Sequence, residues 1–153
     1  MLKVAIFALA LVGAAGVAVA QSIDSVDEAW AIASRNSVSP DEWTMAYVDN
    51  AQAAFIKNEP VSDSAYWVMM LDTEDLTSTL AVAQIECGRS SWSFGTSTIR
   101  SWSGEFISSS PGSAPDYVVP GSVGQAIYDR LCIGVPDSAG RTIWLPVQPN
   151  RSN

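Results

Sequence analysis

Histidine is absent from this sequence of 153 residues. Its absence excludes Ser-His-Asp and Cys-His nucleophile arrangements, and also the zinc sites that use histidine ligands. The two cysteines are too few for an all-cysteine structural zinc site. Lysine is nearly absent as well, because Lys57 is the only lysine after Lys3. An enzyme mechanism would therefore depend on paired carboxylates or on Lys57.

Basic residues are scarce. The whole chain has 8 Lys and Arg against 16 Asp and Glu. Without Lys3 the balance is seven against 16, a net charge of −9, and the basic residues form no cluster. Phosphate binding depends on clustered Lys and Arg, so we expect neither nucleic acid nor an anionic membrane as a partner.

Residues 1–20 have the pattern of a secretory signal peptide. Lys3 precedes an apolar run over residues 4–17, and Ala18-Val19-Ala20 supplies a small-x-small cleavage site. An uncleaved helix of this length could instead span a membrane. No cysteine lies near the cleavage site to accept a lipid anchor. We expect a periplasmic or secreted protein that is not inserted in the membrane after cleavage.

The 133 residues from Gln21 are enough for one domain of ordinary size and too few for two. Residues 21–42 form a lead-in that is partly helical or loose. It has a weak helical stripe of four residues, and Pro40 follows it. These four are Ile23, Val26, Trp30 and Ala33. Residues 43–134 form the main domain, and residues 135–153 form a C-terminal tail.

A two-residue period begins at Trp43, where Trp43, Met45, Tyr47 and Asp49 alternate with other side chains, and it predicts a strand. Further strands are predicted over 52–57, 65–72, 79–88, 90–97 and 105–109. In the strand over 65–72 both faces are apolar and are expected to be covered. The short connections favour an antiparallel meander, because parallel neighbours need a crossover of a dozen or more residues.

A short helix is predicted after the proline-containing segment 110–120. Ser122 and Gln125 match a capping box, in which each side chain bonds a free backbone N–H at the helix start. Val123, Ile127 and Leu131 recur every four residues and form an apolar stripe. Gly134 is a suitable C-terminal cap.

Cys87 closes a predicted strand and Cys132 lies near the end of this helix. In an oxidising compartment the pair would be a structural disulfide that holds the helix on the sheet. Closing a loop of about 45 residues would stabilise the fold by about 4 kcal/mol on chain-entropy grounds. A redox-active pair is the alternative, although the two residues lack a Cys-x-x-Cys spacing.

Tryptophan supplies the candidate contact residue. Trp43, Trp67 and Trp92 lie in strand patterns and are expected in the core. Trp102 lies in a serine-rich run with few other apolar residues, so we expect it to be exposed and to contact a partner.

Three carboxylates are weaker candidates. Asp49 falls on the predicted face of Trp43 and could be a general acid or base, but the favoured interpretation is a residue that ends the strand and caps the turn at Asn50. Glu86 and Glu105 could pair as glycosidase carboxylates, but any two acids in a sheet protein could be chosen in this way.

Several short motifs together resemble the bacterial surface-adhesin protein E-like family, over about residues 43–132. They are Trp43 with Tyr47-Val48-Asp49, Tyr66-Trp67, Glu86-Cys87-Gly88, and Val119-Pro120-Gly121-Ser122 before a helix ending at Cys132. The resemblance implies an α+β fold, in which a curved antiparallel sheet of about six strands carries the C-terminal helix on its concave face, tied by the disulfide.

The family's namesake is similar to a surface lipoprotein that binds extracellular-matrix and serum proteins of a host. The resemblance therefore implies an exported, adhesin-like protein-binding module of the bacterial envelope, with no catalytic activity and no cofactor. Its protein partner is unidentified, and a homodimer is possible. The alternative is a periplasmic accessory or inhibitor protein that acts on a cell-wall enzyme.

Overall fold

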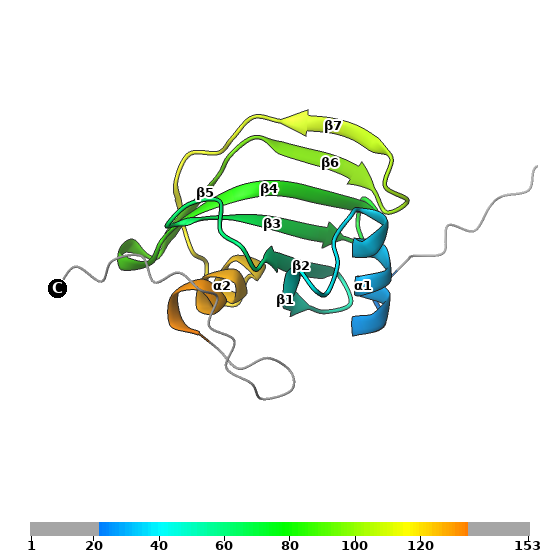
Figure 1. Ribbon diagram of the computed structural model, residues 1–153, viewed down its shortest axis with the longest axis horizontal. Coiled ribbons are helices and arrows are strands. Elements are labelled where there is room, and N and C mark those ends of the chain that lie inside the picture. The colour runs from blue at the N-terminus through cyan, green and yellow to red at the C-terminus, as the bar shows by residue number, and fades with distance from the viewer. Residues whose placement is uncertain (1–21, 135–153) are drawn as a thin grey trace, which may run out of the picture.

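The computed structural model describes residues 22–134, so the predicted signal peptide (1–20) and the tail (135–153) lie outside the described residues. An antiparallel sheet carries two helices (Figure 1). The strands are β1 (Trp43–Val48), β2 (Gln52–Lys57), β3 (Ala65–Asp72), β4 (Thr77–Glu86), β5 (Ser91–Phe94), β6 (Ser97–Ser101), β7 (Phe106–Ser110) and β8 (Asp116–Tyr117). The helices are α1 (Val26–Arg35) and α2 (Val123–Tyr128), with a 3₁₀ turn, η1 (Cys87–Arg89), after β4 and a π turn, η2 (Asp129–Ile133), after α2.

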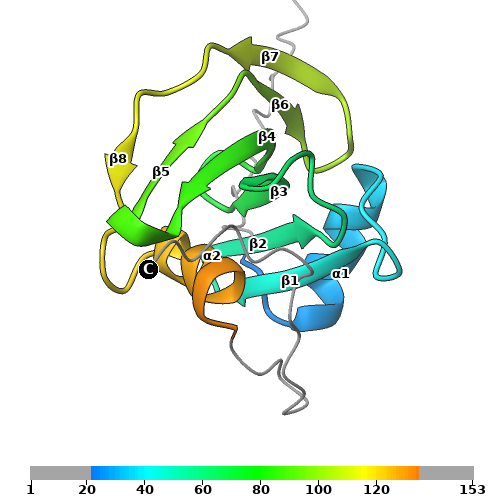
Figure 2. The same cartoon turned by 60° about the vertical axis from the view of Figure 1, so that its left-hand side comes forward.

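The eight strands form a meander that is effectively six strands wide. Strands β1 to β4 pair in chain order, and β5 and β6 then share one side of β4. β5 and β6 are two halves of one bent strand, because both pair antiparallel with β4. At the bend, between Phe94 and Thr98, the register against β4 shifts by one residue. Gly95 lies at the bend and its N–H bonds the carbonyl O of Val82 at 2.8 Å. β7 and β8 line the outer side of β6 and β5 in the same way (Figure 2). The α+β fold class predicted from the sequence is confirmed.

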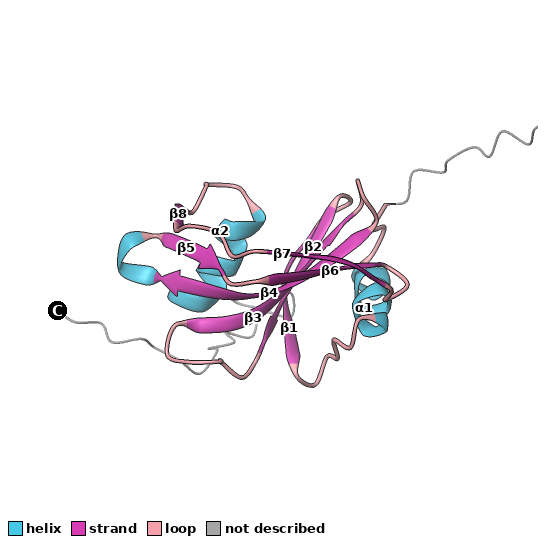
Figure 3. Ribbon diagram, turned by 90° about the horizontal axis from the view of Figure 1, so that it is seen from above, coloured by secondary structure: helices cyan, strands magenta, loops and turns pink. Residues whose placement is uncertain are grey.

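Each face of the sheet carries its own core because successive side chains of a strand point to opposite faces. In β2, Ala53 and Phe55 pack with α1, whereas Ala54 and Ile56 pack beneath α2, and all four are fully buried. We name these sides the α1 face and the α2 face. The two helices also lie at opposite ends of the molecule along its long axis (Figures 1 and 3).

Helix α1 begins at a capped serine and buries one stripe. The Ser25 hydroxyl oxygen accepts a hydrogen bond from the N–H of Glu28 at 3.1 Å. Ala29, Ile32 and Ala33 are buried against the sheet. Val26 is exposed, so its assignment to the inward stripe was wrong. The residues before Trp43 thus contribute to the core of the same folded unit.

Helix α2 begins at Ser122, whose hydroxyl oxygen accepts from the N–H of Gln125 at 3.2 Å, as the sequence predicts. The reciprocal bond of a capping box does not form, because the backbone N–H of Ser122 donates to the carbonyl O of Val119 at 3.2 Å. The Gln125 amide nitrogen donates to the carboxylate of Asp129. Gly134 ends the π turn with a φ of +71°, a conformation that glycine adopts without steric cost. Its N–H bonds the carbonyl O of Asp129 at 2.8 Å.

Two side-chain orientations differ from the sequence prediction. A bulge in β1 between Met45 and Tyr47 reverses the alternation, so Trp43 packs on the α1 face and Tyr47 on the α2 face. Trp67, predicted as core, is 37 % exposed. It lies on the α1 face of β3 with Met69 and Leu71, but α1 covers only the end of the strand that holds those two.

Candidate binding surface

Trp102 is buried, so its predicted exposure was wrong, and the contact role drawn from that exposure loses its support. Only 8 % of the residue is exposed, and it packs in the core cluster of the α1 face. Its indole Nε1–H donates to the carbonyl O of Thr77 at 3.1 Å. The serine-rich turn that follows β6 folds back under the end of α1. A Cβ added at Gly104 would lie 2.7 Å from the carbonyl O of Arg35, so the backbone at this position must approach α1 closely.

Cys87 and Cys132 form the predicted disulfide, with their Cα atoms 5.5 Å apart and 45 positions apart in the chain. Tyr128 reinforces the link, because its hydroxyl donates to the carbonyl O of Cys87 at 2.7 Å. The bond joins η2 to η1 at the end of β4 and fixes the position of α2 on the sheet. It also indicates an oxidising, extracytoplasmic environment.

Asp49 caps a turn. Its Oδ1 accepts hydrogen bonds from the backbone N–H groups of Ala51 and Gln52, at 2.8 and 2.7 Å. A hydrogen bond from the Tyr47 hydroxyl, together with these backbone bonds, holds the pKa of the Asp49 carboxyl below its ordinary value, and burial opposes the shift only in part. The Asp49 carboxyl therefore has a depressed pKa, whereas a general acid at neutral pH needs a raised one.

Glu86 and Glu105 lie at opposite ends of the sheet. Glu86 ends β4, whereas Glu105 follows β6, whose Ser101 pairs with the first residue of β4. The two ends of β4 are nine residue steps apart, or about 30 Å at about 3.3 Å per step. Glycosidase carboxylates lie about 5 to 10 Å apart. The structure does not bring these two acids together.

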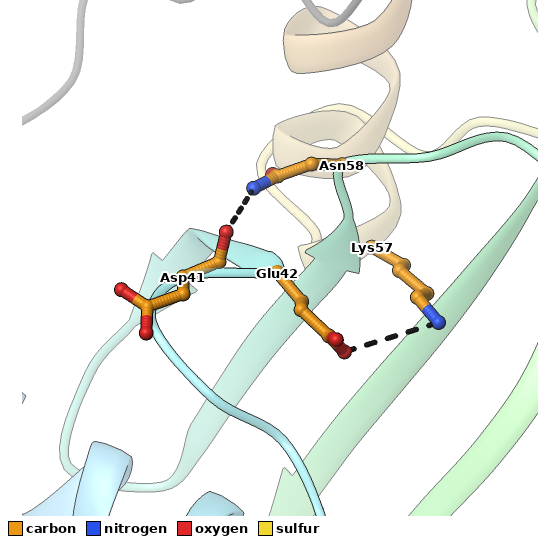
Figure 4. Close-up of polar contacts among 4 residues, drawn as sticks. All are labelled: Asp41, Glu42, Lys57 and Asn58. Atoms are coloured by element: carbon orange, nitrogen blue, oxygen red, sulfur yellow. Dashed lines mark hydrogen bonds and ion pairs between the residues drawn. The ribbon is translucent and has the colours of Figure 1, made fainter.

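Lys57 lies in a small polar pocket of about 200 Å³ at the start of β1. Its ammonium Nζ is 4.0 Å from a carboxylate oxygen of Glu42 (Figure 4). Asn58 bridges the neighbouring loop, donating to the carbonyl O of Asp41 at 3.5 Å and accepting from the Thr44 hydroxyl at 2.7 Å. The carboxylate of Asp41 points away from Lys57 (Figure 4). The two hydrogen bonds of Asn58 and the long, solvent-exposed ion pair together join the start of β1 to the end of β2.

The outer edge of the sheet, formed by β7 and β8, carries large exposed apolar side chains. Within residues 22–134 each strand pairs on one side only, β7 with β6 and β8 with β5. Phe106 is 65 % exposed and Ile107 is 54 % exposed at the start of β7, and Tyr117 in β8 is 75 % exposed. No charged residue occurs within β7. Natural sheets usually protect such an edge with charges, bulges or a covering element. The pairing of β7 with β6 has a bulge at Ile107, and residues 108–110 are serines. The strand still carries no charge and begins with two exposed apolar side chains, so it is a surface suited to pairing.

A larger pocket of about 370 Å³ opens on the α2 face. Its floor comes from the facing side chains of β2, β3 and β4, including Gln52, Met70 and Thr79. Trp92, the start of α2 and the β8 segment form its walls. A Cβ added at Gly124 would lie 2.7 Å from the Trp92 ring, so α2 packs directly against that tryptophan.

Two aspartates lie at this pocket. Asp72 ends β3, and its carboxylate accepts from the Gln52 amide at 3.2 Å and from the N–H of Glu74 at 2.7 Å. Asp116 lies in β8 and accepts from the N–H of Tyr117 at 2.8 Å. Both carboxylates retain free lone pairs, since each oxygen can accept more than one hydrogen bond.

No local sequence pattern singles out Phe106, Tyr117 or the two aspartates. Phe106 and Ile107 are part of a predicted strand, but nothing local shows that the strand lies at an edge. Tyr117 lies in a loop pattern between prolines. The places of these residues at the edge and at the pocket depend on which strands pair. Strand pairing is decided by contacts between distant parts of the chain.

Comparisons of this chain with protein-family models, with curated proteins and with solved structures find no match. The likeness to the surface-adhesin E-like family thus stays a prediction. Within residues 22–134, no helix is long and apolar enough to cross a membrane. Across the same part of the chain, no three His, Cys, Asp or Glu side chains are placed to hold a metal ion together.

Proposed function

We propose that this chain is an exported protein-binding module of the bacterial envelope without catalytic activity, and that it binds an extended segment of its protein partner along β7. The observation that carries the proposal is the uncharged outer edge of β7, with Phe106 and Ile107 more than half exposed. An edge strand offers unpaired backbone N–H and C=O groups to a second strand, and neighbouring apolar side chains add specificity.

The remainder of the molecule suits a rigid support for such an edge. β7 is held by β6, and β6 is held by β4, which has partners along both sides. The disulfide and the two cores fix the sheet on both faces. A rigid, pre-formed edge lowers the ordering cost of binding, because only the partner's segment must become ordered.

The test is capture of a partner by the mature chain and by edge variants. Ile107→Lys places a charge on the edge and should abolish capture without unfolding the domain, since Ile107 is exposed. Val61→Lys is the matched control, because Val61 is 50 % exposed and lies outside β7 and β8. Capture by the wild type and Val61→Lys, with loss in Ile107→Lys, supports the proposal. Equal capture by all three proteins contradicts binding at β7.

The identity of the captured protein separates the remaining alternatives. A stoichiometric complex with one periplasmic enzyme, accompanied by loss of that enzyme's activity, would favour an inhibitor. A second copy of the same chain, detected as a dimer by light scattering and lost in Ile107→Lys, would make β7 a homodimer interface.

A further inference from the structure

The pocket on the α2 face combines an apolar wall with negative charge. Its volume of about 370 Å³ lies within the range of pockets that hold small organic ligands, about 300 to 1,000 Å³. The side chains of Met70, Val119 and Val123 give it apolar surface, and Trp92 and Tyr117 give it two aromatic rings. This composition favours a ligand with an apolar body.

The charged groups of the pocket have one sign. Asp72 and Asp116 line it, and among the residues that the structure describes no Lys or Arg does so. The field of the rest of the chain has the same sign, with a net charge of −9 over the residues from Gln21. A cleft with acidic walls in an acidic protein concentrates cations and repels anions. The aromatic rings add to this preference, because the face of an aromatic ring attracts a cation.

We propose that this pocket binds an organic cation, a single ammonium or guanidinium group on a compact apolar body. The apolar body lies against Trp92 and Met70, and the cation lies near Asp72 and Asp116. Such a cation can come from a free amine or from a lysine or arginine side chain of a protein. The inference goes beyond binding at β7 and does not depend on it.

The start of α2 also borders the pocket, and a helix start carries partial positive charge. Here it is weak, because α2 has six residues and the hydroxyl oxygen of Ser122 already accepts from the N–H of Gln125. Two full carboxylate charges outweigh a partial charge of about one half. Because the helix start by itself would favour a negative charge, an organic anion is the competing ligand that the experiment must include.

The experiment is a titration of the ¹⁵N-labelled mature chain with three probes of nearly equal size, followed by NMR. The probes are phenethylamine, the neutral alcohol 2-phenylethanol and the anion 3-phenylpropionate. We expect the indole N–H signal of Trp92 and the amide signal of Gly124 to shift with the amine, and to shift less or not at all with the others. If the alcohol binds as tightly as the amine, the positive charge does not contribute to binding and the proposal is contradicted. If the anion binds more tightly than the amine, the proposal is overturned.

Variants locate the site. Asp72→Asn and Asp116→Asn should each weaken amine binding about two- to fivefold, the usual effect of one partly exposed charge. Asp63→Asn removes the same charge from an exposed loop outside the pocket and should leave the affinity unchanged. Tyr117→Ala should weaken binding and leave the fold intact, because Tyr117 is 75 % exposed. Equal weakening by Asp63→Asn would show only general attraction of cations to an acidic protein, and would contradict the assigned site.

A fourth probe identifies the source of the cation. N-acetyl-arginine methylamide carries its only positive charge on the side chain, as an arginine within a protein does. If it shifts the same signals and binds more tightly than phenethylamine, the natural ligand is a basic side chain of a protein. If the amine binds more tightly, the ligand is a free amine. Retained amine binding in Ile107→Lys would separate this pocket from the edge at β7.

Discussion

The indole of Trp102 donates a hydrogen bond to the carbonyl O of Thr77, the first residue of β4, at 3.1 Å. The backbone N–H of Trp102 donates to the carbonyl O of Leu76 at 3.1 Å. These bonds fasten the turn after β6 to the turn before β4, and the ring fills the α1 face of the core. Trp102 is therefore a structural residue of the fold.

Trp102→Ala should lower the free energy of unfolding by about 3 to 5 kcal/mol, the usual cost of removing a buried tryptophan. Trp67→Ala should cost about 2 kcal/mol less. The exposed fractions of the two residues are 8 % and 37 %, a difference of about 70 Å² for a side chain of about 250 Å². Urea unfolding of both variants shows which substitution lowers the free energy of unfolding more. A larger loss for Trp67→Ala would contradict the burial described for Trp102.

Reduction of the Cys87–Cys132 disulfide should lower the free energy of unfolding by about 4 kcal/mol, because the loop it closes spans 45 positions. For a domain of this size the loss corresponds to a fall in Tm of about 10 to 20 °C. Calorimetry with and without reductant measures it, with the Cys87→Ser/Cys132→Ser double variant as a control that should not respond to reductant. Titration of two free thiols in the native protein, purified without reductant, would contradict the disulfide.

Gly124→Ala should destabilise the protein by about 1 to 3 kcal/mol, although alanine favours helices over glycine. An added Cβ would lie 2.7 and 2.9 Å from two atoms of the Trp92 ring, so the ring or α2 must move. Gly88→Ala is the matched control, because no heavy atom lies within 4 Å of its added Cβ. Thermal unfolding and the NMR signal of the Trp92 indole report both effects. If Gly124→Ala is as stable as Gly88→Ala, α2 does not pack on Trp92 as described.

The Asp49 turn should make a small contribution to stability that depends on pH. The pKa of its carboxyl is lowered by the hydrogen bond from Tyr47, so the stabilisation is complete above the unfolded-state pKa of about 3.9 and is lost as the pH falls through the lower folded-state value. Asp49→Asn should cost less than about 1 kcal/mol near pH 7, since the group is exposed. Unfolding measured at pH 7 and again near pH 2 should show the difference between wild type and variant shrinking. A difference that grows toward acid pH would mean that the sign of the shift is wrong.

Regular elements with strong local patterns could be predicted from the sequence. The strand over residues 65–72 and the helix capped by Ser122 both lie where their apolar periods place them. The disulfide could be predicted because Cys87 directly follows one such element and Cys132 lies near the end of another. In each case the signal lies within about ten residues of chain.

The orientation of the tryptophans could not be predicted in the same way. Burial of Trp102 depends on the fold of a turn beneath α1, which is more than 60 residues away in the chain. Exposure of Trp67 depends on where α1 ends over the sheet. The bulge that reverses Tyr47 relative to Trp43 leaves no mark in an alternating pattern. For the same reason the edge at β7 and the acidic pocket could be found only once the strand pairing was known.

Binding along β7 is tested most directly by site-specific photocrosslinking in the native envelope extract. A photoreactive amino acid at position 107 should crosslink the mature chain to one protein, and unlabelled wild type should compete for it while unlabelled Phe106→Lys should not. The same amino acid at position 61 should give no such product, because Val61 lies outside the edge. Crosslinking from position 61 in equal yield, or no product from position 107, would contradict a protein-binding module that uses this edge.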